Sequence, residues 1–149
     1  MSNPRLPAKV RRAIIRLAGG SCEYCRSQMR FSGDPFSIDH IMPRARDGSD
    51  EMDNLALCCL GCNNIKFISV EAFDPVTREI VPLYHPRRQR WSDHFDWNLD
   101  FTLVVGLTPT GRATIEKLQL NREGLVNYRR VLAAMGEHPP ADPIRRRRY

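Results

Sequence analysis

The chain has 149 residues, a net charge of +6 at pH 7 and a hydrophobic fraction of 42%. This length and composition suit one soluble globular domain, with a modest core because eleven prolines and nine glycines interrupt the chain. No apolar run is long enough to span a bilayer, which argues against a membrane protein, and residues 1–7 lack the apolar stretch of a signal peptide. We therefore expect a cytoplasmic protein with reduced thiols.

The first predicted element is a helix over residues 7–18. Apolar side chains recur there with helical spacing, while Arg11, Arg12 and Arg16 face away, and a Gly-Gly pair follows the pattern. Residues 21–26 are expected to form a tight turn in which two cysteine sulfurs point the same way.

Two short strands and a helix are predicted next. Residues 36–40 alternate between apolar and polar side chains, and Leu55 and Leu57 share one face of a strand over 55–58. A polar loop over 44–53 separates them, and the following helix is expected to start at Asn63. Strand, loop, strand and helix in this order predict a ββα unit.

The rest of the chain predicts further small elements, for an α+β fold overall. These are a hairpin segment at 76–81, a strand at 97–105, and helices beginning at 111 and spanning 125–135. We expect three parts: a core over 7–70, an extension packed on it over 71–136, and a flexible basic tail over 137–149.

Four of the five cysteines form two Cys-x-x-Cys pairs, Cys22/Cys25 and Cys59/Cys62. In a reducing compartment this spacing is typical of a closed tetrahedral zinc site with a structural role. The alternative is two chance pairs of buried cysteines, which is much less common. Cys58 precedes Cys59 on a strand, so its side chain is expected to point away from the zinc ligands.

Polar residues of the kinds that hydrolyse phosphodiesters lie between and beside these pairs. Asp39 and His40 are adjacent, and imidazole has an ordinary pKa that suits proton transfer near neutral pH. Asn54 can donate and accept across the loop, and the amide oxygen of Asn63 suits a hard cation such as Mg²⁺. Taken singly, each has a plainer explanation: a surface Asp-His pair, a turn asparagine and a helix N-cap.

Basic residues cluster around the same segments, which favours contact with nucleic-acid phosphates over a merely solvated surface. Arginine predominates, and it binds phosphate in a bidentate manner. The residues expected to bind nucleic acid are Arg44, Arg46, Lys66, Arg87, Arg88 and Arg90.

The runs Ile38-Asp39-His40-Ile41-Met42-Pro43-Arg44 and Asp53–Lys66 resemble the zinc-stapled bacterial type of HNH endonuclease, a ββα-metal nuclease, in its His-Asn-Asn variant. The resemblance spans about residues 17–66, and a weaker likeness to an extension found on many members spans 83–114. It implies that His40 is the general base, that Asn54 orients it and ties the loop, and that Asp39 and Asn63 hold the catalytic cation. Family members often carry Gly-Gly where this chain has Asp47-Gly48.

These features predict a metal-dependent endonuclease that hydrolyses DNA, or RNA, with structural Zn²⁺ and catalytic Mg²⁺ or Mn²⁺. The alternative is a zinc-stabilised module that binds nucleic acid without cutting it, which explains the cysteines and the charge but not the placement of Asp39, His40, Asn54 and Asn63. The sequence leaves the oligomeric state open, a dimer included.

Overall fold

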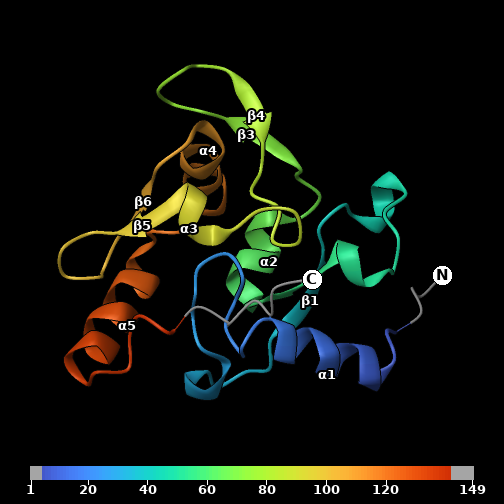
Figure 1. Ribbon diagram of the computed structural model, residues 1–149, viewed down its shortest axis with the longest axis horizontal. Helices are drawn as coiled ribbons and strands as arrows, with labels where there is room; N and C mark the ends of the chain where they lie inside the picture. Colours follow the sequence, from blue (N-terminus) through green and yellow to red (C-terminus); the bar gives the residue numbers. More distant parts are fainter. Residues whose placement is uncertain (1–4, 142–149) are drawn as a thin grey trace, which may run out of the picture.

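Three two-stranded antiparallel hairpins and five α-helices make up the part of the chain that the computed structural model describes, residues 5–141 (Figure 1). The fold is α+β, as predicted. Within this range no helix combines the length and apolarity needed to cross a membrane.

Helix α1 (Ala8–Leu17) confirms the first predicted element. Ile14 is fully buried, and the helix packs against the second strand of the first hairpin. Arg11 donates a hydrogen bond of 2.6 Å to the carbonyl of Phe36, just before the first strand. The helix is thereby fixed to the hairpin at its apolar face and at this arginine.

The predicted ββα unit is present. β1 (Ser37–His40) pairs with β2 (Leu55–Cys58) in an antiparallel register that sets His40 opposite Leu55. Helix α2 (Leu60–Lys66) follows at once and packs against β1. The expected start at Asn63 is wrong, because Cys59 already caps the helix: its sulfur accepts a hydrogen bond from the Cys62 amide.

The extension is built from two hairpins and three helices. They are β3 (Glu71–Phe73), β4 (Ile80–Pro82), α3 (Trp91–His94), β5 (Phe95–Trp97), β6 (Val104–Gly106), α4 (Pro109–Leu118) and α5 (Glu123–Ala134). The single strand expected over 97–105 is wrong. The Asn98 side chain accepts hydrogen bonds from the amides of Thr102 and Leu103, and Phe101 takes a positive φ of 63°, so the run reverses into the β5–β6 hairpin.

Buried contacts join the extension to the ββα unit, and one cluster of buried apolar residues includes members of both. Arg87 forms a two-pronged ion pair with Glu23 at 2.6 and 2.7 Å, and the indole of Trp91 donates to the carbonyl of Tyr24. Arg129 is 1% exposed and donates to the carbonyl of Cys25. Two arginines of the extension, Arg87 and Arg129, therefore attach it to the segment that contains Glu23 and Cys25.

The expected tail does not begin at residue 137. His138 is buried, donates a 2.8 Å hydrogen bond from Nε2 to the carbonyl of Phe101, and packs edge-on against Trp97. Glu137 forms an ion pair with Arg30. The remainder of the predicted tail from residue 142, including the arginine run, lies outside the described residues.

Candidate metal centre and active site

The four predicted zinc ligands converge. The sulfurs of Cys22, Cys25, Cys59 and Cys62 all lie within 4.8 Å of one another, and all four residues are buried. Cys25 and Cys59 sulfurs are 3.7 Å apart. A tetrahedral ion with Zn–S bonds of about 2.3 Å requires sulfurs roughly 3.8 Å apart, so the donor set and spacing fit zinc.

The electrostatics of the four thiols also favour a cation. Burial raises the pKa of Cys22, whereas hydrogen bonds from the three other thiols lower the pKa of Cys59. Four thiolates in one buried volume repel each other strongly, and a divalent cation is what allows all four to ionise. Cys58 is buried and is not part of the quartet, as predicted, but its thiol does not point away from it, because it lies within hydrogen-bonding reach of Cys22.

Arg122, from the turn between α4 and α5, lies over this cluster. Its guanidinium nitrogens are 3.5 and 3.6 Å from the sulfur of Cys62 and 3.7 Å from that of Cys59. A side chain at Gly61 would collide with it, since an added Cβ would lie 2.6 Å from an Arg122 nitrogen. The extension thus supplies a positive charge to the sulfur atoms.

His40 ends β1, and its side chain is 15% exposed. Its Nε2 lies 2.8 Å from Asp50, which also receives two hydrogen bonds of 3.0 and 3.1 Å from Arg44. Arg44 and His40 together lower the pKa of Asp50. Asp50 was not predicted as a site residue: it lies ten positions after His40, in a loop whose path the sequence pattern does not define.

Asn54 ties the loop between the strands. Its amide nitrogen donates to the carbonyls of Met42 and Ser49, and its amide oxygen accepts from the Met42 amide. The side chain makes no hydrogen bond to the His40 ring within residues 5–141. Its influence on His40 passes through the loop backbone, where its carbonyl accepts from Ile41.

The loop also requires the Asp47-Gly48 turn. Asp47 has a φ of 63°, in the left-handed region that Asp tolerates better than most residues. A side chain at Gly48 would overlap the Met42 carbonyl, since an added Cβ would lie 1.7 Å from that oxygen. A Gly-Gly pair would remove only the backbone strain at position 47. Position 48 is already glycine, which allows the backbone to approach the Met42 carbonyl closely.

Asp39 points away from His40, as alternation along a strand requires. It is 3% exposed, accepts a 2.7 Å hydrogen bond from the Tyr24 hydroxyl, and lies 3.2 Å from the ammonium of Lys66. Burial raises the pKa of Asp39, an effect that Lys66 and the Tyr24 hydroxyl oppose. In this arrangement the carboxylate is neutralised by a side chain of the protein.

Asn63 lies on α2 three positions before Lys66, so the two side chains are neighbours on the helix surface. It is half-buried, and its side chain makes no hydrogen bond within the described part of the chain. Because Lys66 reaches the carbonyls of His40 and Ile41, this face of α2 lies against the end of β1.

Two of the residues expected to bind nucleic acid need correction. Lys66 is 1% exposed, and its ammonium is held by Asp39 and backbone carbonyls. Arg87 is committed to Glu23, with side chains 11% and 9% exposed. Arg44 is partly exposed and bound to Asp50. Exposed positions in the predicted set are Arg46, Arg88 and Arg90.

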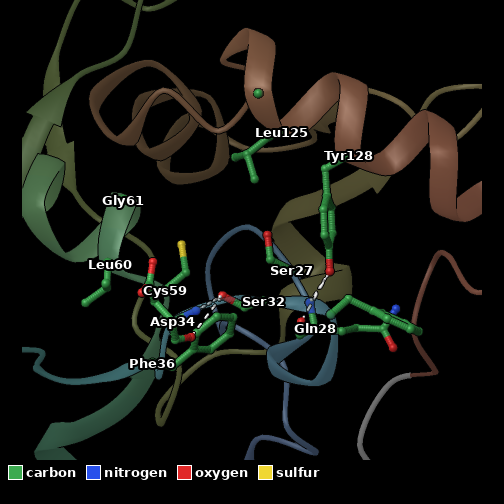
Figure 2. A pocket seen from close by; sticks show the side chains of 12 residues that line it. Ser27, Gln28, Ser32, Asp34, Phe36, Cys59, Leu60, Gly61, Leu125 and Tyr128 are labelled. Atoms are coloured by element: carbon green, nitrogen blue, oxygen red, sulfur yellow. Dashed lines mark hydrogen bonds between the residues drawn. The ribbon is translucent and has the colours of Figure 1, made fainter.

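A pocket of about 330 Å³ lies between α5 and the turns that carry the zinc ligands (Figure 2). Leu125 and Tyr128 reach down from α5, and the Tyr128 hydroxyl is hydrogen-bonded to the backbone of Gln28. The pocket shares Cys59 with the zinc cluster but includes neither His40 nor Asp50. It is therefore separate from the candidate catalytic residues.

Residues 22–67 match the family model for HNH endonucleases. No curated protein matches the chain. The matched segment contains all four zinc-site cysteines together with His40, Asn54 and Asn63, and its strand–strand–helix order agrees with the match. The segment is thus similar to HNH endonucleases, and it carries a buried cysteine cluster suited to structural zinc.

Proposed function

We propose that this protein hydrolyses phosphodiester bonds in DNA, with His40 as the general base that removes a proton from the attacking water. The observation that carries the proposal is the pairing of His40 with Asp50 on the matched segment. A carboxylate accepts, so Nε2 holds the proton, and Nδ1 remains an acceptor with no partner within residues 5–141. A neutral imidazole with one free nitrogen suits general-base catalysis.

Asp50 is proposed as a positioning residue for this base. Its carboxylate fixes the ring tautomer and stabilises the imidazolium that forms after proton transfer, as an orienting acid does in other hydrolases. Arg44 holds the same carboxylate through two hydrogen bonds. Asn54 acts one step further out, because its three backbone hydrogen bonds hold the loop that carries Asp50.

Asn63 and Asp39 are proposed as ligands of a catalytic Mg²⁺ or Mn²⁺. Asn63 suits this role because its side-chain amide has no hydrogen-bond partner within residues 5–141 and lies on the helix that packs against β1. Asp39 fits less well, because it must first exchange Lys66 for the cation. When bound, such a cation would stabilise the negative charge that develops on the scissile phosphate.

DNA is the proposed substrate, with RNA as an alternative that shares the same phosphate chemistry. Arg46, Arg88 and Arg90 are exposed and available to neutralise phosphates. Arg44 can contribute at the edge of the site, since its side chain is 25% exposed. A cytoplasmic location is part of the same proposal.

Nicking of supercoiled plasmid by the zinc-loaded protein, with and without Mg²⁺, tests this function. His40→Gln keeps a donor for Asp50 but cannot accept the proton, so cleavage should fall by roughly 10²–10⁴-fold. His94→Gln is the matched control, because His94 is packed against Thr108 rather than placed at the site. Metal-independent binding without any cleavage by the parent would instead establish the non-catalytic module.

A further inference from the structure

Helix α1 carries a row of basic side chains that the predicted nucleic-acid contacts did not include. Lys9, Arg12 and Arg16 follow one another at i, i+3 and i+7, so they lie on one side of the helix; we name them the α1 stripe. All three are exposed. None of the three side chains makes an ion pair or hydrogen bond within residues 5–141.

The chain segment that carries the α1 stripe contains no negatively charged side chain. The sequence has no Asp or Glu before Glu23, and Arg5 adds a further exposed cation just ahead of the helix. By contrast, Arg11 on the same helix has a structural role, because it donates to the Phe36 carbonyl. The stripe cations are therefore free to bind a partner.

At the N-terminal end of α1 the charges do not stabilise the helix, although Arg16 in the last turn does. The first turn contains Lys9 and no acidic residue, and no side chain caps the N-terminus. Cations at this end oppose the helix dipole, and their positive potential adds to that of the free amide groups. The positive charge at this end of α1 therefore favours an anionic partner.

We propose that the α1 stripe is a contact surface for the phosphate backbone of duplex DNA. The inference rests on the proposed function and names a further part of its substrate-binding surface. Lys9 and Arg16 are separated by roughly 10 Å along the helix axis. This span corresponds to about three phosphate steps along one strand.

Two contacts connect this surface to the candidate site. Arg11 bonds the residue that precedes β1, and Ile14 is buried in the cluster that includes Leu55 and Leu57 of β2. Helix α1 is thus fixed to the hairpin that carries His40 (Figure 1).

A membrane surface fits this helix less well. A membrane-binding amphipathic helix inserts its apolar face among lipids. In α1 that face is occupied: Ile14 is 0% exposed, and Val10 and Ile15 pack against the core. Leu17 is the large apolar residue of α1 that remains mostly exposed, at 49%.

The test is the salt dependence of binding to a fluorescent duplex in Mg²⁺-free buffer. The stripe variant replaces Lys9, Arg12 and Arg16 with Gln, which is also a good helix former. The control variant removes the same charge by replacing Arg78, Lys117 and Arg130, exposed cations on the β3–β4 turn, α4 and α5. Zinc content and thermal unfolding check that both variants are folded.

Each lost phosphate contact should reduce the slope of log Kobs against log salt by about 0.9, or about 2.7 for the stripe variant, and weaken binding roughly eightfold per contact at 0.1 M salt. The control variant should keep the parent's slope. Equal slopes for the two variants would overturn the inference. So would stripe-dependent binding to phosphatidylserine vesicles with unchanged DNA binding.

Plasmid cleavage by the parent is scored separately, so the two proposals can fail independently. A stripe-dependent slope without cleavage supports the DNA-binding surface and refutes the nuclease. Cleavage together with a stripe-independent slope refutes the surface and leaves the nuclease proposal standing.

Discussion

Replacing Lys66 with Met probes the buried ion pair beneath the candidate site. Lys66 is 1% exposed, and its ammonium lies 3.2 Å from Asp39 and 3.2–3.3 Å from the carbonyls of Ile41 and His40. Met fills similar space without charge, so the Asp39 carboxylate remains buried with the Tyr24 hydroxyl as its hydrogen-bond donor. Removing one partner of a buried pair typically costs about 3–5 kcal/mol.

A loss of this size is a large share of the roughly 5–15 kcal/mol that stabilises a typical domain. With an m-value of about 2 kcal/mol/M, it lowers the midpoint of urea unfolding by roughly 1.5–2.5 M. The assay is urea denaturation of the zinc-loaded protein. Lys117→Met, an exposed position on α4, is the control and should change stability by less than about 0.5 kcal/mol.

The double variant Asp39→Asn with Lys66→Met completes a double-mutant cycle. Because it removes both charges, it should be more stable than the sum of the two single losses predicts. If Lys66→Met loses no more stability than Lys117→Met, the ammonium is not part of a buried pair, and the reasoning about Asp39 fails.

Four further predictions concern the zinc cluster, the loop and the extension. Cys59→Ser should lose zinc and unfold, as measured by metal analysis and circular dichroism. A folded, zinc-free variant would contradict the structural role of the zinc. Arg122→Met should release zinc to a chelator faster than the parent, because the thiolates lose a donor and a positive charge; an unchanged release rate would remove Arg122 from the metal environment. Asp50→Asn should reduce kcat by a larger factor than it changes KM. A rise in activity would instead identify Asp50 as a group that competes with the substrate phosphate for the site. Arg112 lowers the pKa of Asp74, so this pair stabilises the fold fully above the ordinary carboxyl pKa of about 3.9, and the stabilisation declines as pH falls from there towards the lowered pKa of the folded state. The difference in urea stability between the parent and Asp74→Asn should therefore shrink steadily as pH falls below about 4, and a constant difference would refute the pairing.

Local patterns predicted the parts of the fold whose determinants lie close together in the sequence. The spacing of the two Cys-x-x-Cys pairs predicted the buried quartet. Alternation predicted the paired strands β1 and β2, and helical periodicity predicted α1.

The errors concern residues whose partners are distant or whose backbone changes direction. Lys66 and Arg87 were expected at the nucleic-acid surface, but their partners Asp39 and Glu23 are 27 and 64 residues away, and a charge pattern does not identify such partners. The start of α2 was misplaced because the capping atom is a cysteine sulfur rather than a familiar oxygen.

The candidate site shows the same division. Sequence reasoning identified His40 as a candidate but did not find Asp50, because their 2.8 Å contact depends on the folded path of the loop. The Asn54 hydrogen bonds and the left-handed Asp47 determine that path, and neither is visible in hydrophobic periodicity.

The most direct test of the central claim is chemical rescue of a His40→Gly variant in plasmid nicking with Mg²⁺. The zinc-loaded variant should be inactive on its own, and added imidazole should restore cleavage in a concentration-dependent manner, because the free base takes the place of the missing ring. Cleavage at the parent's rate without imidazole would contradict the assignment of His40 as the base.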